Sequence, residues 1–169
     1  MELNWVVELV IAVLATFAAA SIGTLATFKA IPTWYTGLKK PRLTPPNRAF
    51  GPVWTALYIL MAVSAFLVWD KGLNAAGATL AFVLYWIQLA FNAFWSVVFF
   101  GLKSKGGGVF VIVTLWLLIL AALVADFRVS IAAGALLIPY ILWVSLASYL
   151  NIGVWLLNKN QERSNVEQP

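Results

Sequence analysis

Residues 106–125 read GGGVFVIVTLWLLILAALVA, a run of 20 positions without a charged side chain. An α-helix rises about 1.5 Å per residue, so a helix of this length crosses a hydrocarbon core about 30 Å thick. Four further charge-free runs cover residues 9–28, 49–69, 72–102 and 129–158, and they contain 20, 21, 31 and 30 residues. The sequence therefore predicts an all-α membrane protein, a bundle of five transmembrane helices.

The overall composition favours lipid over water as the main solvent. Hydrophobic residues make up 63% of the 169 positions and charged residues only 10%, against roughly 25% charged in a soluble domain. We expect one domain, residues 1–158, with spans at about 6–28, 50–69, 77–102, 107–126 and 130–157, and a polar tail at 159–169. A cleaved signal peptide is the alternative for the first segment. Its start has no Lys or Arg, which favours a retained span.

The basic residues indicate how the bundle is oriented. With five spans, the first and third connections and the C-terminus lie on one side of the membrane. Of the eleven bases, those on that side are Lys29, Lys39, Lys40, Arg42, Arg48, Lys103, Lys105, Lys159 and Arg163, and those on the other are Lys71 and Arg128. The positive-inside rule then predicts the N-terminus out and the C-terminus in. Because topology accounts for the net charge of +5, nucleic acid is not an expected partner.

The connection from Lys29 to Arg48 differs from the other connections, which are short. It contains four prolines, five bases and the pair Trp34–Tyr35. Proline fixes its own φ and favours extended backbone in the residue before it, so the run KKPRLTPP at 39–46 is stiff. We expect a structured loop that covers one end of the bundle.

Several kinds of chemistry lack the residues that they need. The sequence has no Cys and no His, which removes disulfides, most zinc sites and the usual axial ligands of haem iron. No metal site and no fixed cofactor is expected. The six acidic residues lie at predicted span ends or in tails. Ion-coupled transport needs an ionisable group within the membrane, so it is disfavoured.

Polar and aromatic side chains mark one face in each of two spans. Residues of the third span that recur at helical spacing are Gln88, Asn92, Trp95, Ser96 and Phe99. The fifth span has a second stripe, after a break at Pro139 and Tyr140, that consists of Trp143, Ala147, Asn151 and Val154. Such faces either bond neighbouring helices together or line a pocket.

Nine tryptophans are many for this length. An aromatic belt at the membrane surfaces accounts for those near span ends, which are Trp5, Trp34, Trp69 and Trp155. Trp54, Trp95 and Trp143 lie deeper, where they either face lipid or line a cavity. A cavity with aromatic walls, few polar groups and a basic lid suits a flat hydrophobic ligand with acidic groups. Porphyrins have that chemistry, whereas sterols match only the walls.

Three segments resemble the translocator protein family, whose members are also called tryptophan-rich sensory proteins or peripheral-type benzodiazepine receptors. The segments are WYTGLKKPRLTPPNRAFGPVWTALY at 34–58, QLAFNAFWSVVFF at 88–100 and PYILWVSLASYLNIGVWLLN at 139–158. The first is specific, because Trp-Tyr, Lys-Pro, Pro-Pro and Gly-Pro-Val-Trp-Thr follow one another at the family's intervals. The resemblance covers most of the chain and leaves out the tail.

The resemblance implies a membrane receptor or sensor, commonly a homodimer. It would bind porphyrins, haem-like tetrapyrroles and synthetic isoquinoline or benzodiazepine-type ligands in a pocket closed by the first loop. Carried over by position, the ligand-binding residues are Tyr35, Pro45, Trp54, Tyr58, Gln88, Asn92, Trp95, Phe99, Trp143 and Ala147. A porphyrin or haem would be a ligand rather than a fixed cofactor.

Three functions stay open on the sequence. The protein senses, buffers or transports tetrapyrroles, or it degrades porphyrin with light and oxygen, as some bacterial members of the family do. In the second case the matching catalytic residues are Trp54 and Trp143. A small transporter of another hydrophobic solute is the third reading. All three suit a multi-pass protein of a bacterial or an organellar membrane.

Cholesterol is not an expected partner. The cholesterol pattern of the animal members needs a Lys or Arg within a few residues after its tyrosine. Here Tyr149 is followed by a base only at Lys159, too far away for the pattern, which is itself a weak signal.

Overall fold

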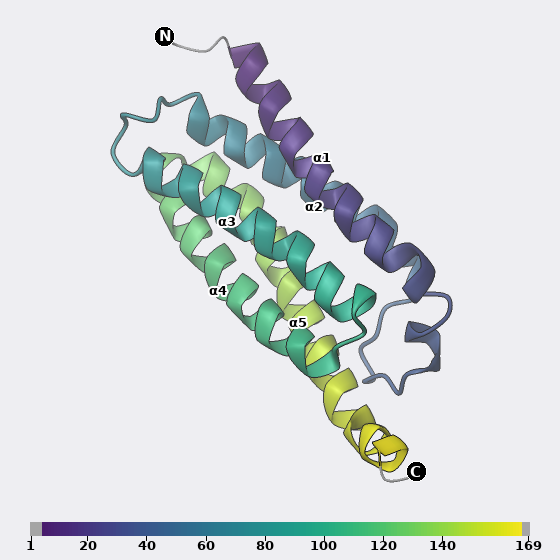
Figure 1. The fold of residues 1–169 in the computed structure, drawn as a ribbon. Helices are drawn as coiled ribbons and strands as arrows, with labels where there is room; N and C mark the ends of the chain where they lie inside the picture. Colours follow the sequence, from purple (N-terminus) through teal and green to yellow (C-terminus); the bar gives the residue numbers. More distant parts are fainter. Residues whose placement is uncertain (1–4, 167–169) are drawn as a thin grey trace.

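The computed structural model describes residues 5–166, with side chains from Trp5 to Lys159. The long helices are α1 (Trp5–Ala30), α2 (Asn47–Trp69), α3 (Ala78–Ser96), α4 (Lys105–Val129) and α5 (Ile131–Val166). A short 3-10 helix, η1 (Tyr35–Gly37), lies between α1 and α2, and a π-helical segment, η2 (Val97–Gly101), extends α3. No strand occurs over the described residues, so the predicted all-α bundle is confirmed (Figure 1).

All five helices are long and apolar enough to cross a membrane. The helical backbone of α5 continues beyond the expected end at 157 and runs through part of the polar tail to Val166. That part contains neither Gly nor Pro, so nothing in it stops the helix. The described ends of α1 and α5 lie at opposite ends of the bundle (Figure 1), as an odd number of spans requires. Which end faces the cytoplasm stays a prediction.

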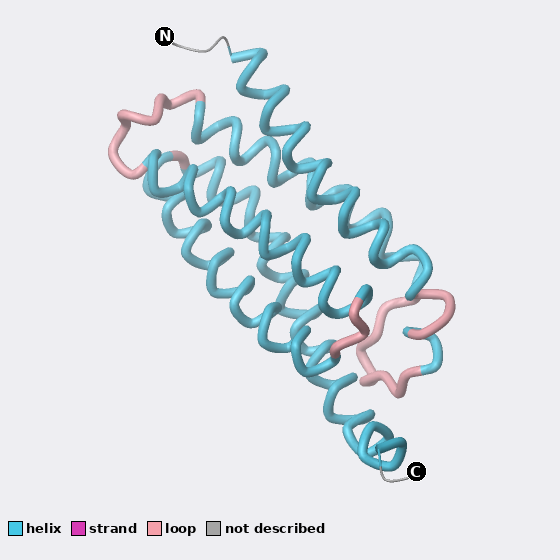
Figure 2. Tube along the Cα trace, in the orientation of Figure 1, coloured by secondary structure: helices cyan, strands magenta, loops and turns pink. Residues whose placement is uncertain are grey.

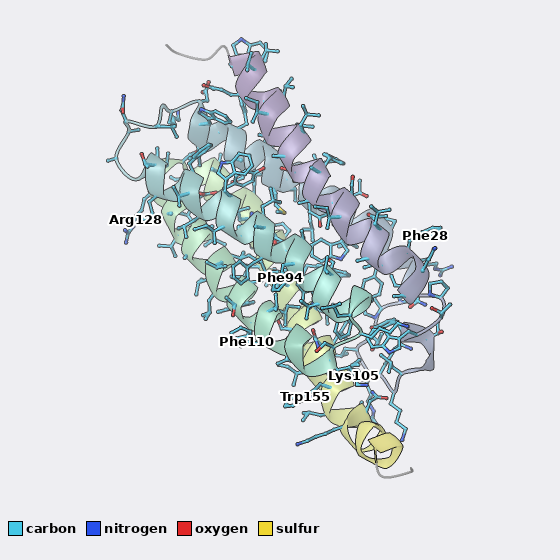
Figure 3. All side chains as sticks on the ribbon, viewed as in Figure 1. Phe28, Phe94, Lys105, Phe110, Arg128 and Trp155 are labelled. Carbon is cyan, nitrogen blue, oxygen red and sulfur yellow. The ribbon has the colours of Figure 1, made fainter. Side chains whose placement is uncertain are left out.

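The outer surface of the bundle is apolar. Phe28, Phe94 and Phe110 project outward from three different helices (Figure 3) and are 75%, 51% and 74% exposed. Large contiguous apolar surfaces of this kind are unusual on soluble monomers and ordinary in lipid. Together with the five spans, they establish an integral, multi-pass membrane protein.

Helix α1 packs against α2 and α3 through small side chains. Ala12, Thr16, Ala19 and Gly23 follow one another at intervals of three or four residues, and all four are buried. Small residues allow helix backbones to approach closely in lipid. The hydroxyls of Thr16 and Tyr85 also share a hydrogen bond between α1 and α3. The face of α1 that meets the bundle is therefore a row of small residues.

Loop 1, residues 31–46, is structured as expected and lies at the same end of the bundle as the C-terminal half of α5 (Figure 2). The backbone N–H of Lys39 donates to Asn158 Oδ1 over 3.1 Å, and Asn158 Nδ2 donates to the Lys39 carbonyl over 2.9 Å. Pro41 packs on Gly153, where an added Cβ would lie 2.7 Å from Pro41 Cγ. Two positions of α5 therefore hold the loop.

One of the acidic residues at a span end is buried between helices. Asp126 is 5% exposed. The Ser64 hydroxyl oxygen lies 2.8 Å from Asp126 Oδ2 and 2.8 Å from the Ala133 carbonyl oxygen. Asp126 is near the end of α4 in sequence, but α2 and α5 cover it from the side. The expected position of Asp126 at a span end therefore holds, and what the sequence did not indicate is its burial between helices.

Ser64→Ala should lower the free energy of unfolding by about 1 kcal/mol, a typical value for a polar contact between membrane helices. The substitution removes the hydroxyl that links Asp126 to the neighbouring helices. Unfolding by SDS in mixed micelles measures the effect. Ser148→Ala is the matched control, because the Ser148 hydroxyl bonds only the Val144 carbonyl of its own helix. Equal losses in the two variants would contradict a linking role for Ser64.

Candidate ligand-binding cavity

A cavity of about 820 Å³ lies between α1 and α2, beside the C-terminal end of α3. The residues that line it are Phe17, Ala20, Ser21, Gly23, Thr24, Leu25, Thr27, Phe28, Ile31, Pro32, Asn47, Phe50, Gly51, Trp54, Thr55, Tyr58, Trp95, Ser96 and Phe100. Pockets for drug-sized ligands measure roughly 300–1,000 Å³ and are mostly apolar with a few polar groups. This cavity has that size and that character.

One wall of the cavity is aromatic. The Trp54 ring centroid lies 5.6 Å from that of Tyr58 and 6.3 Å from that of Trp95, and the planes are inclined by 30° and 32°. Behind the wall, Phe99 stacks on Trp95 with centroids 5.8 Å apart and planes 9° apart. Ring contacts of this kind each contribute about 0.5–1.5 kcal/mol beyond area burial. The wall is therefore a packed layer of rings.

A hydrogen bond fixes the orientation of Trp95. Its Nε1 donates to Asn151 Oδ1 over 3.0 Å, and Asn151 Nδ2 donates to the Lys105 carbonyl over 3.1 Å. Asn151 thereby joins α3 to α5 and to the first turn of α4, and it is 1% exposed. The indole N–H of Trp95 is occupied, so this ring offers a ligand its apolar surface.

A chain of buried hydrogen bonds supports the wall from behind. Tyr58 Oη donates to Asn92 Oδ1 over 2.7 Å, and Asn92 Nδ2 donates to Tyr140 Oη over 2.8 Å. Tyr140 Oη donates in turn to Gln88 Oε1 over 3.0 Å. The chain connects α2, α3 and α5. Gln88 and Asn92 thus bond neighbouring helices and do not themselves line the cavity.

The ten residues predicted to bind the ligand are not all brought together. Trp54, Tyr58 and Trp95 line the cavity. Gln88, Asn92, Phe99 and Ala147 are buried in the bundle, Tyr35 and Pro45 belong to loop 1, and Trp143 lies elsewhere; none of these seven lines the cavity.

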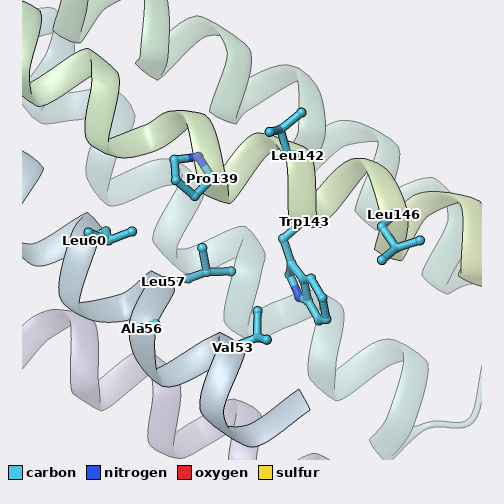
Figure 4. Close-up of a pocket in the computed structure, with 8 residues that line it drawn as sticks. All are labelled: Val53, Ala56, Leu57, Leu60, Pro139, Leu142, Trp143 and Leu146. Atoms are coloured by element: carbon cyan, nitrogen blue, oxygen red, sulfur yellow. The ribbon is translucent and has the colours of Figure 1, made fainter. Parts of the chain in front are cut away.

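Trp143 lines a second hollow of about 440 Å³ between α2 and α5 (Figure 4). The other residues around it are aliphatic or proline, namely Val53, Ala56, Leu57, Leu60, Pro139, Leu142 and Leu146. The indole packs edge-on against Phe50 at 5.9 Å, and its Nε1 is buried without a hydrogen-bond partner among the described residues. Trp54 and Trp143, which the resemblance pairs in catalysis, therefore line different hollows.

The contribution of α1 was missing from the predicted site. Eight of the nineteen lining residues belong to α1, between Phe17 and Phe28. The first span has no stripe of amides or tryptophans that would single it out. Small residues around Gly23 were the available signal, and they indicate close helix packing as readily as a cavity wall.

Tyr35 anchors loop 1 among aromatic rings. Its ring lies 6.3 Å from Phe99 and 5.7 Å from Phe100, and Lys40 Nζ lies 4.8 Å from its centroid. Burial raises the pKa of the Tyr35 phenol above its ordinary value of 10.0. The docked loop therefore holds the phenolic proton more tightly than a released loop. The contribution of the protonated Tyr35 phenol to docking of the loop is fully present below pH 10. It is lost as the pH rises through the raised pKa.

The ionisation of Tyr35 is measured by following the ultraviolet absorbance of phenolate as the pH is raised. Subtracting the curve of the Tyr35→Phe variant from that of the wild type leaves the contribution of Tyr35. The difference curve is expected to have its midpoint above pH 10, because phenolate formation must overcome desolvation. A midpoint at the ordinary value would contradict burial of Tyr35.

The chain matches a known family over most of its length. Residues 11–156 match the TspO/MBR family. The chain is 38% identical to a tryptophan-rich sensory protein of Cereibacter sphaeroides over 164 residues, which cover 95% of this chain and 97% of that protein. It is 36% identical to the tryptophan-rich protein TspO of Archaeoglobus fulgidus over 153 residues, 90% and 98% of the two chains. It is 37% identical to the translocator protein of Homo sapiens over 123 residues, which cover 72% of this chain and 73% of that protein. The chain therefore belongs to the TspO/MBR family.

Proposed function

We propose that this protein is a membrane receptor that binds tetrapyrroles such as porphyrins in the cavity between α1 and α2. The observation that carries the proposal is the wall of Trp54, Tyr58 and Trp95 on a space of about 820 Å³. Indole and phenol rings offer large apolar faces against which a flat aromatic macrocycle stacks.

Charges next to the cavity support a ligand with acidic groups. Phe28 and Asn47 line the cavity near loop 1, and the next residues in the chain, Lys29 and Arg48, are exposed. A tetrapyrrole would place its ring among apolar side chains and its carboxylates toward these cations. The basic residues therefore fit a ligand that is apolar in the middle and acidic at its edge.

Titration with protoporphyrin IX in detergent micelles tests the proposal. Saturable quenching of tryptophan fluorescence is expected for the wild type, because Trp54 and Trp95 line the cavity. Trp54→Leu should weaken binding about tenfold, which corresponds to the loss of one favourable ring contact. Trp5→Leu is the control, since Trp5 is 57% exposed at the other end of α1. Equal affinities of the two variants, or no saturable quenching at all, would contradict the proposal.

Light-dependent degradation of the bound porphyrin is a second candidate. It is favoured by the position of Trp54, whose ring lines the cavity and lies beside Tyr58 and Trp95. Bleaching of protoporphyrin IX under illumination in air measures this activity. The Trp54→Phe, Trp143→Phe double variant is expected to bleach the porphyrin more slowly. An unchanged rate would exclude Trp54 and Trp143 as the residues that carry it, and no bleaching by the wild type would rule the activity out.

A further inference from the structure

Most hydroxyl groups around the cavity already donate a hydrogen bond to an acceptor within the protein. Four of them donate to carbonyl oxygens of their own helix over 2.8–3.0 Å; they belong to Ser21, Thr24, Thr27 and Thr55. The Tyr58 hydroxyl donates to Asn92. These five groups present oxygen lone pairs to the cavity and no free proton.

Ser96 is different. It lines the cavity and is 6% exposed, and its hydroxyl has no hydrogen-bond partner within the described part of the chain. It stands where α3 changes into the π-helical segment η2, marked by the Leu102 N–H to Val97 carbonyl bond of 2.8 Å. The Ser96 side chain lines the cavity, so its hydroxyl is available to an acceptor atom of a ligand.

Gly23 lets α1 approach Ser96 closely. A Cβ built on Gly23 would lie 3.2 Å from Ser96 Oγ and 3.7 Å from Tyr58 Oη. The two hydroxyl oxygens thus approach the same point on α1. A side chain at position 23 would crowd both hydroxyls, so glycine is what lets α1 lie this close to them.

We infer that Ser96 donates a hydrogen bond to an acceptor oxygen on the edge of the ligand that enters the cavity beside α3. This inference rests on the proposed function and adds a specificity rule to it. The site selects flat apolar ligands that carry a carbonyl or carboxyl oxygen over ligands of the same shape without one. Selection of this kind follows because the Ser96 donor stays unpaired when the oxygen is missing.

Two uncharged porphyrins separate the two ligand classes. Protoporphyrin IX dimethyl ester carries carbonyl oxygens, and etioporphyrin carries no oxygen. Ser96→Ala is expected to weaken binding of the ester about three- to tenfold, the equivalent of one hydrogen bond, and to change binding of etioporphyrin less than about twofold. Ser148→Ala is the control, since its hydroxyl bonds Val144 outside the cavity. Gly23→Ala keeps the donor but places a Cβ 3.2 Å from Ser96 Oγ, so it should also weaken binding of the ester.

The outcomes distinguish this inference from the function on which it rests. If the wild type binds protoporphyrin IX but Ser96→Ala and Ser148→Ala bind the ester equally well, the inference is wrong and the receptor function stands. A similar loss for the ester and for etioporphyrin would also overturn it, because that pattern indicates altered packing. If the wild type binds none of the three porphyrins, both proposals fail.

Discussion

Tyr140→Phe is expected to lower the free energy of unfolding by about 2–3 kcal/mol, since each buried polar group left without a partner costs roughly 1–3 kcal/mol. The Tyr140 side chain is 0% exposed. Its hydroxyl accepts a hydrogen bond from Asn92 Nδ2 and donates one to Gln88 Oε1. Phenylalanine keeps the ring and leaves both amides with one partner fewer. Because Asn92 also accepts the hydrogen bond of Tyr58, the change reaches the cavity wall.

Tyr149→Phe is the matched control for this substitution. Tyr149 belongs to the same helix, is 43% exposed and makes no hydrogen bond within the described residues. SDS unfolding in mixed micelles should show a stability near that of the wild type for Tyr149→Phe. If Tyr140→Phe were equally stable, the hydrogen-bond chain would contribute nothing to the fold. Tyr58 and Tyr140 would then stabilise the fold only through the packing of their rings.

The stripe on the third span shows how far the sequence leads. Helical spacing predicts that Gln88, Asn92 and Trp95 share a face, and all three are buried. Helical spacing predicts which residues share a face of one helix. It does not predict which residues of a neighbouring helix that face will contact. Here Tyr140 and Asn151 of α5 stand opposite and take up the polar atoms. Of these three residues, only Trp95 lines the cavity. Which of them does so is decided by how α2, α3 and α5 pack together.

Position along a helix is easier to predict than the direction in which a side chain points. Trp54 and Trp143 both lie several residues inside their spans, and both line a hollow. The hollows are different because Trp54 of α2 lies toward α1 and α3, whereas Trp143 of α5 lies toward another part of α2. The participation of α1 was hidden for a related reason. Its residues around Gly23 are small and uncharged, so neither polarity nor aromatic content marks them.

The stiffness of loop 1 follows from its prolines, but its attachment does not. Asn158 and Lys39, which hold each other through two hydrogen bonds, are separated by 119 positions. Asparagine at the end of an apolar span looks like an ordinary boundary residue. Its role becomes visible only when the loop and α5 are placed side by side.

Asn158→Ala is expected to increase the rate of tryptic cleavage after Arg42 about thirtyfold. The side chain makes both hydrogen bonds to the backbone of Lys39, and each contributes about 1 kcal/mol net, so the released state of loop 1 becomes about thirty times more populated. Arg42 is exposed and lies three residues beyond the anchored position. Cleavage needs an extended, free segment, so the rate reports release of the loop.

Two further variants separate loop release from general loosening. Asn74→Ala changes the same residue type at an exposed position between α2 and α3, and its cleavage rate after Arg42 should equal that of the wild type. Gly153→Ala leaves Asn158 intact and pushes on Pro41 through the 2.7 Å approach of the new Cβ. It should raise the rate as well, because the loop would have to move off α5. If Asn158→Ala and Gly153→Ala both resisted trypsin like the wild type, contacts elsewhere would have to hold loop 1, with the ring packing of Tyr35 the first to examine.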